Sequence, residues 1–227
     1  MAVRATSLQL YDFLCQHIVG TEETVRTKRL ITTIADNLDD DDFNAVGTIT
    51  SGSSGEGISL KGSDLDIMYV SKSFVVHEDT KNVKIVPEKM NLVMDINDTK
   101  IGFTQLRLLN DFTEVVAKCT KLFEDRGNSW YLSSEMSKLL MMNSNLSHIH
   151  GPCVSDINER LDLAIGLHNP HWIKAAGNWI SRGHASWPSS DVKSEVIAHG
   201  VLYVPIGSKG SANEALEWRI SFSVAEK

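Results

Sequence analysis

The sequence predicts a mixed α/β (α+β) fold in which helices cover a twisted, mixed β-sheet. Apolar residues recur at helical spacing in the N-terminal segment, and from Asn44 onward they alternate with polar residues, as in strands. The 227 residues are 42% hydrophobic and 22% charged, which excludes a mainly disordered, collagenous or coiled-coil chain. We expect residues 1–42 to form N-terminal helices that pack on a core of residues 43–227, in one structural unit.

Two helices are predicted before the core, at 6–19 and 22–38, with Gly20 between them. The acidic run 39–42 ends the helical region, because like charges at a helix C-terminus oppose the helix dipole. This run could bind a cation, but a solvated acidic loop is the favoured interpretation. The residues that share one face of each predicted helix are Leu8, Tyr11, Leu14, Cys15 and Ile18, and then Leu30, Ile31, Ile34 and Leu38.

The core begins with a predicted strand, a Gly-rich turn and a second strand, at 45–49, 51–57 and 64–70. One helix is expected to begin at a cap on Asn110 or Asp111 and to stop at Gly127. The remaining elements are strands at 90–96, 102–109, 160–167 and 201–206, and a helix at 133–142.

Charge and cysteine content restrict the cellular setting. The chain has 22 Lys and Arg against 29 Asp and Glu, a net charge of −7, which argues against a surface wholly devoted to nucleic acid. Cys15, Cys119 and Cys153 are too few and too scattered for a disulfide framework, and we expect them to be core thiols in a reducing compartment. The first twenty residues contain neither a secretory signal nor a membrane span, so the expected location is the cytoplasm, away from membranes.

Alternation along the second predicted strand places Asp64 and Asp66 on one face. Two neighbouring carboxylates repel each other unless a positive group lies between them, and a hard divalent cation such as Mg²⁺ accepts their oxygens. The turn at Gly52 and Ser53 offers backbone N–H groups and a hydroxyl that suit a triphosphate oxygen. Considered alone, the pair of aspartates would be interpreted as a hydrated strand end.

The two features together resemble a known motif. Gly52-Ser53, ten further residues and then Asp64-Leu65-Asp66, with a strand on either side, are similar to the DNA-polymerase-β-like nucleotidyltransferase superfamily. A two-metal site needs a third carboxylate, for which Asp95 and Asp162 are candidates. Asp162 is preferred, because a carboxylate among the apolar residues 160–165 would be costly to bury unless it were paired or metal-bound.

The final segment resembles one branch of that superfamily. Residues 217–227, preceded by Trp187-Pro188, are similar to the end of the catalytic core in cyclic GMP-AMP synthase-like receptors and Mab-twenty-one proteins. The resemblance spans residues 47–227 and places the third family aspartate on Asp162. It also implies long N-terminal spine helices and a helical Trp-Arg-x-Ser-Phe-Ser element. By the same resemblance, the acceptor nucleotide is held by Arg219, Ser221, Ser223 and Glu226.

This resemblance implies an activity. The chain is expected to join ATP and GTP into a cyclic dinucleotide in innate immune sensing, releasing pyrophosphate, with double-stranded RNA or DNA as a candidate activator. Asp64, Asp66 and Asp162 would bind two Mg²⁺ (or Mn²⁺) ions. Two alternatives remain open: a catalytically silent Mab-twenty-one-type developmental or scaffolding protein, and a linear RNA-tailing polymerase.

Departures from the family pattern add three expectations. The zinc insertion of the vertebrate DNA sensor is not present, so no zinc is expected, and ordinary loop residues are the favoured interpretation of His148, His150 and Cys153. Arg26, Lys28 and Arg29 on the second helix are interpreted as a solvated helix face. Relatives continue into a C-terminal helical lobe, which we expect to be absent from this chain.

Overall fold

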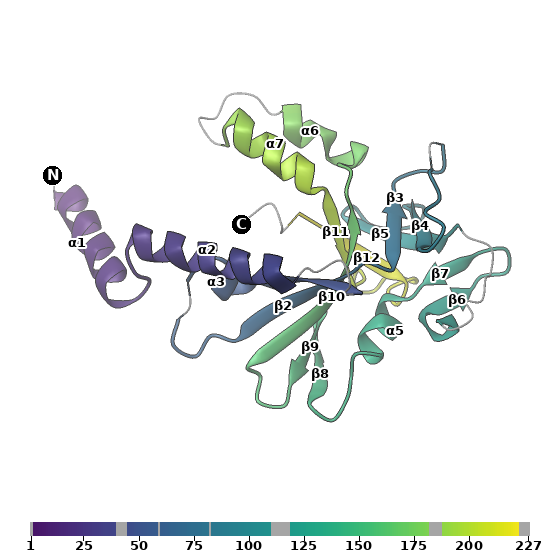
Figure 1. Ribbon diagram of the computed structural model, residues 1–227, viewed down its shortest axis with the longest axis horizontal. Coiled ribbons are helices and arrows are strands. Elements are labelled where there is room, and N and C mark those ends of the chain that lie inside the picture. Colours follow the sequence, from purple (N-terminus) through teal and green to yellow (C-terminus); the bar gives the residue numbers. More distant parts are fainter. Residues whose placement is uncertain are drawn as a thin grey trace.

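The computed structural model of the protein describes residues 2–39, 45–58, 60–81, 83–109, 119–181 and 188–222. It has the predicted mixed α/β architecture (Figure 1). The helices are α1 (Ala2–His17), α2 (Glu22–Asp39), α3 (Gly52–Gly55), α5 (Ser134–Leu139), α6 (Gly177–Ser181) and α7 (Ser190–His199), with short 3-10 turns η1 (Thr120–Leu122) and η2 (Lys174–Ala176). The strands are β1 (Val46–Ser51), β2 (Leu65–Ser71), β3 (Phe74–His77), β4 (Met90–Asp95), β5 (Phe103–Leu108), β6 (Phe123–Asp125), β7 (Trp130–Leu132), β8 (Leu146–His150), β9 (Cys153–Asp156), β10 (Leu161–Asn169), β11 (Val201–Val204) and β12 (Glu217–Ser221).

The strands form one mixed sheet in the order β1-β2-β10-β11-β12-β5-β4-β3. β10 runs parallel to β2 and β3 runs parallel to β4, whereas the other pairs are antiparallel. β10 connects the two halves of the sheet, because its first part pairs with β2 and β9 and its end pairs with β11. The hairpin β8–β9 and the hairpin β6–β7 branch from this path.

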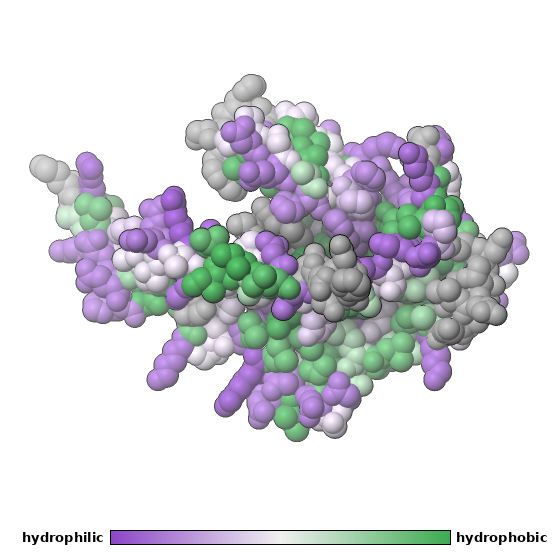
Figure 2. Space-filling view, in the orientation of Figure 1, coloured by the Kyte–Doolittle hydropathy of each residue, from purple (hydrophilic) through white to green (hydrophobic). Residues whose placement is uncertain are grey.

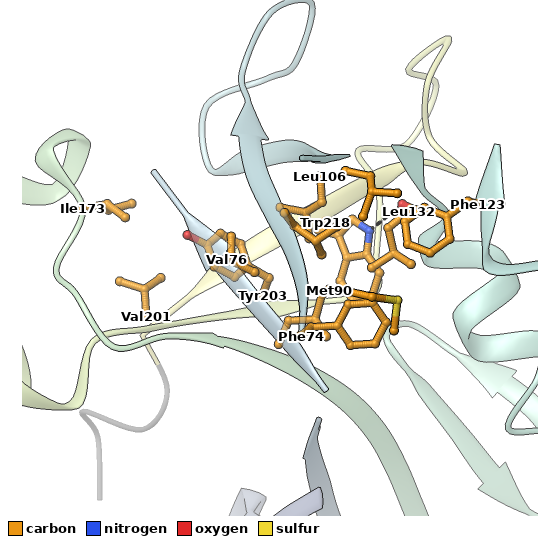
Figure 3. Packing of buried hydrophobic residues seen from close by; sticks show 13 residues of the cluster. Phe74, Val76, Met90, Leu106, Phe123, Leu132, Ile173, Val201, Tyr203 and Trp218 are labelled. Atoms are coloured by element: carbon orange, nitrogen blue, oxygen red, sulfur yellow. Dashed lines mark hydrogen bonds between the residues drawn. The ribbon is translucent and has the colours of Figure 1, made fainter. Parts of the chain in front are cut away.

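Hydrophobic residues pack on both faces of the sheet. The larger cluster surrounds Trp218 and Tyr203, which are completely buried, and includes Leu106 and Leu132 (Figure 3). The indole Nε1 of Trp218 donates a hydrogen bond to the carbonyl of Leu132 at 2.9 Å, so the ring is buried without an unsatisfied N–H. The smaller cluster lies on the opposite face and consists of Met68, Ala164, Leu202 and Val204.

The N-terminal helices form at the expected positions, and their apolar residues are largely exposed. α2 is attached to the sheet by Asp36, whose carboxylate accepts hydrogen bonds from the backbone N–H and the hydroxyl of Thr50 at 2.7–3.1 Å. Ile31 and Leu38 remain 62% and 77% exposed, and Figure 2 shows hydrophobic residues gathered on the visible side of this helix. α1 extends away from the sheet (Figure 1). Within the described residues, no helix combines the length and the apolar character needed to cross a bilayer.

Two expected helices are corrected by the structure. Of the helix predicted from Asn110 or Asp111 to Gly127, residues 110–118 lie outside the described residues, and the rest is η1 followed by β6. Phe123 enters the larger core cluster from a strand that pairs with β7, and this tertiary packing overrides the helical spacing. The Trp-Arg-x-Ser-Phe-Ser element is also a strand up to Ser221, because β12 lies between β11 and β5.

Candidate metal and nucleotide site

Three carboxylates converge at one end of the parallel pair β2–β10. Asp66 on β2 lies directly opposite Asp162 on β10, and Asp64 precedes Asp66 by two residues, on the same face. Each of the three offers a carboxylate oxygen, and these oxygens all lie within 4.8 Å of one another. We call these residues the acidic triad. All three were predicted from the sequence, and the structure brings them together.

The triad is electrostatically unbalanced. Burial raises the pKa of Asp66, and the nearby carboxylates of Asp64 and Asp162 raise this pKa further. In the part of the chain that the structure describes, no hydrogen-bond donor contacts a triad carboxylate. Nδ1 of His150 lies 4.0 Å from Oδ2 of Asp162. Three converging carboxylate oxygens without a hydrogen-bond donor among the described residues suit a divalent cation, so the triad could hold a metal ion.

The Gly-rich turn packs directly against the triad. β1 pairs with β2 so that Ser51 lies opposite Asp66, and Gly52 follows with φ +57° as the first residue of α3. A Cβ atom at Gly52 would lie 1.9 Å from Oδ2 of Asp66, so only glycine fits beside that carboxylate. The half-buried Ser53 follows at once. The predicted turn is therefore present, with the short helix α3 inside it.

Helix α2 supports the other end of this turn. The side chain of Arg29 donates from Nε to the carbonyl of Glu56 at 2.6 Å, and the backbone of α2 approaches Gly57 closely. Gly57 has φ +75°, and a Cβ atom there would lie 2.6 Å from the carbonyl oxygen of Val25. Arg29 was expected to belong to a solvated helix face, but it holds the turn that adjoins the triad.

The residues predicted to bind the acceptor nucleotide are described in part. Arg219 and Ser221 lie on β12, opposite Val204 and Leu202 of β11, and therefore on the sheet face that carries the smaller cluster and the triad. Arg219 is exposed. Ser223, Glu226 and Trp187 lie outside the described residues.

The pKa of the Cys153 thiol responds to both the triad and Arg219. Burial raises the pKa of its thiol to about 11, with further increases from the carboxylates of Asp162, Asp66 and Asp64 and an opposing contribution from Arg219. The same thiol is therefore influenced by the triad and by Arg219, which lies three strands away from β2. Cys119 and Cys153 pack against the core clusters as predicted, whereas Cys15 lies on α1, outside both clusters.

The competing candidate for the third carboxylate has a structural role. Asp95 accepts hydrogen bonds from the hydroxyl of Tyr131 at 2.9 Å and from the backbone and side-chain N–H groups of Asn97 at 3.1 and 2.8 Å. Its oxygens are thus occupied by donors of the chain, away from the triad. Asp162 was preferred because of the cost of burying it, and the structure places it together with Asp64 and Asp66.

A separate cavity of about 1030 Å³ lies at the other ends of β2 and β10. Its walls include Val70, His168 and Leu202, together with residues of α2, β1, β3 and α7, and it contains no triad residue. The triad therefore lies outside this cavity.

His148, His150 and Cys153 were interpreted as ordinary loop residues, but they lie on strands: the two histidines on β8 and Cys153 on β9. The structure also brings His150 beside the triad, which was not predicted. The pairing of β8 with β9, and of β9 with β10, causes this proximity. A two-residue Gly151-Pro152 turn between alternating segments was the available signal for the first pairing.

Comparison with known proteins agrees with this arrangement. A family model described as the Mab-21 protein nucleotidyltransferase domain matches residues 64–227, which include the triad. A search of curated proteins finds no match. Because the family model covers well over half of the 227 residues, the chain belongs to the Mab-21 nucleotidyltransferase-domain family.

Proposed function

We propose that this protein is a metal-dependent nucleotidyltransferase that joins ATP and GTP into a cyclic dinucleotide, with release of pyrophosphate. The acidic triad is the observation that supports this proposal: three convergent carboxylates without a donor among the described residues, in a nucleotidyltransferase domain. A cytoplasmic role in innate immune sensing, with double-stranded RNA or DNA as activator, is part of the same proposal. It rests on the resemblance to cyclic GMP-AMP synthase-like receptors.

Each group of the site has a proposed task. Asp64, Asp66 and Asp162 hold two Mg²⁺ or Mn²⁺ ions. When bound, the ions neutralise the triphosphate and favour ionisation of the attacking ribose hydroxyl. Gly52 and Ser53 hold the triphosphate tail, which the absence of a side chain at Gly52 allows to approach Asp66 closely. The ribose oxygen forms a bond to the α-phosphorus, and the bond from that phosphorus to pyrophosphate breaks.

The acceptor nucleotide is assigned to β12 and the residues after it. Arg219 has a planar guanidinium that can stack on a base and pair with phosphate, and it lies exposed on the triad face of the sheet. Ser221 lies on the same face, two residues further along the strand. Ser223 and Glu226 complete the proposed set by resemblance. In this arrangement, β2 and β10 serve the transferred nucleotide and β12 serves the attacking one.

The proposal is tested by incubating the full chain with ATP, GTP, Mg²⁺ or Mn²⁺, and double-stranded RNA or DNA. Products are separated by mass, which distinguishes cyclic dinucleotides from the linear products of an RNA-tailing polymerase. Asp162→Asn should abolish product formation. Asp95→Asn is the matched control, because it neutralises a strand carboxylate outside the triad. Absence of any nucleotide product under all these conditions would disprove the enzymatic function.

A silent scaffolding protein is the second candidate function. The exposed apolar residues of α2, such as Ile31 and Leu38, favour it because a surface of this kind suits a protein partner. Replacing both Asp64 and Asp66 by Ala separates the two functions in cells. If the cellular phenotype survived this double replacement, the scaffolding function would be supported and the catalytic one rejected.

A further inference from the structure

The tip of the β8–β9 hairpin is held beside the triad by the sheet. In β9, Cys153 pairs with Ala164 of β10 on one side and with His150 of β8 on the other. Directly paired residues project to the same face, and Ala164 shares its face with Asp162. His150 is therefore directed to the face of the sheet that carries the triad.

The position of this hairpin is well defined. Val154 is completely buried, and Nζ of Lys138 donates to the carbonyl of Gly151 at 3.3 Å. Gly151 has φ +57° and is followed by Pro152, whose ring fixes φ near about −65°, a combination that suits a tight two-residue turn. His150 itself is held by backbone pairing, while its side chain is 86% exposed and able to turn.

The separation between His150 and Asp162 suits two ligands of one ion. Nδ1 of His150 lies 4.0 Å from Oδ2 of Asp162, too far for a hydrogen bond. Two ligand atoms that each lie about 2.1 Å from the same ion are at most about 4.2 Å apart. One ion could therefore contact both Oδ2 of Asp162 and Nδ1 of His150. A small rotation of the exposed ring would shorten the distance between these two atoms.

An imidazole changes the metal chemistry of a carboxylate site. Mg²⁺ strongly prefers oxygen ligands and sheds its water reluctantly, whereas divalent transition-metal ions accept imidazole nitrogen readily. We propose that His150 supplies a nitrogen ligand to the metal ion at the acidic triad and thereby gives this site a preference for a divalent transition metal over Mg²⁺. This inference rests on the metal site of the proposed function.

The test uses Mn²⁺ and Mg²⁺ alone as probes of the full chain, without nucleotide. Binding of Mn²⁺ is followed by electron paramagnetic resonance, and binding of Mg²⁺ by its competition with Mn²⁺. His150→Ala should weaken Mn²⁺ binding by about tenfold or more and Mg²⁺ binding by less than about threefold. Pulsed measurements should detect a ¹⁴N coupling to bound Mn²⁺ in the unmodified chain and not in His150→Ala.

The matched control is His148→Ala, on the same hairpin. Nδ1 of His148 is hydrogen-bonded to the Ser147 hydroxyl at 2.9 Å, and this substitution should leave both affinities and the ¹⁴N coupling unchanged. An unmodified chain without the coupling, or a His150→Ala chain with unaltered metal preference, would overturn the inference while leaving the proposed function in place. Failure of the unmodified chain to bind either ion would overturn both. Circular dichroism would verify that both variants fold, as expected for exposed side chains.

Discussion

Two sets of carboxylates in this protein, Glu217 alone and the acidic triad, have opposite surroundings. Glu217 is completely buried on β12, and its carboxylate accepts hydrogen bonds from the backbone N–H of Ser208 at 2.8 Å and the hydroxyl of Ser211 at 2.5 Å. The acidic triad has no such donor within the described residues, and its members repel one another. The chain thus satisfies Glu217 by itself and leaves the triad in need of an external positive charge. The difference separates a carboxylate that stabilises the fold from carboxylates available for a ligand.

The largest expected effect comes from neutralising the triad. Asp66→Asn should lower nucleotide transfer by about 10³-fold or more, since a lost metal ligand costs several kcal/mol of transition-state stabilisation. The same change should leave the free energy of unfolding in EDTA unchanged or higher, because a repulsion is removed. Turnover and chemical denaturation measure the two quantities. A large loss of stability would mean that Asp66 belongs with Glu217 as a structural acid.

The next largest effect is expected from removing the carboxylate of Glu217, which has its hydrogen-bond donors within the chain. Glu217→Ala should lower the free energy of unfolding by about 3 kcal/mol, because it leaves the N–H of Ser208 and the hydroxyl of Ser211 without an acceptor. Denaturant titration measures this loss. Metal affinity per folded molecule should be unaffected. A selective loss of metal binding with unchanged stability would contradict the proposed division between the two sets.

A smaller effect is expected from the turn against the triad. Gly52→Ala should cost about 1–2 kcal/mol of stability for the left-handed backbone alone, with a further loss of metal affinity because its Cβ would displace the Asp66 carboxylate. Gly62→Ala is the matched control: its φ is +90°, and a Cβ atom there would meet no other group within 4 Å. Calorimetric titration of Mn²⁺ compares them. Equal metal affinities in the two variants would show that the contact with Asp66 is unimportant.

The smallest expected effect is a pH dependence of the triad in EDTA. The folded-state pKa of Asp66 is raised, so the folded chain binds the proton more tightly than the unfolded chain does. Its contribution to stability is therefore full below the unfolded pKa and is lost as pH rises through the folded pKa. Asp66→Asn should be relatively more stable than the unmodified chain at pH 7, and this advantage should shrink on acidification. A constant difference between pH 4 and pH 7 would contradict the raised pKa.

Much of the fold could be predicted from local sequence patterns. The strands near 64–70, 90–96 and 102–109 were found because their side chains alternate, and α2 because its apolar spacing is helical. The predicted helix ending at Gly127 failed because Phe123 packs into the core from a strand paired with β7, a contact that spacing within one segment does not reveal. β12 was also mistaken for a helix, although Trp218 and Ile220 alternate with Arg219 and Ser221.

The parts of the candidate site that depend on neighbouring residues in the sequence could be predicted. Asp64 and Asp66 share a face by alternation alone, and Asp162 was recognised as an acid among apolar neighbours. The approach of His150 to Asp162 depends on the pairing of two further strands, and Arg29 reaches the turn across a gap of 27 residues. Such long-range contacts depend on the assembled sheet, which residue spacing did not specify.

The direct opposition of Asp66 and Asp162 also makes the site a reporter of correct folding. These residues are paired in parallel strands but separated by nearly a hundred residues of chain, so their contact is among those that close the longest loops. A shift of one residue in the β2–β10 register would move Asp162 to the opposite face of the sheet. The metal binding proposed for the triad therefore requires the native alignment, and a chain that misaligned these two strands would be compact but would lack the proposed site.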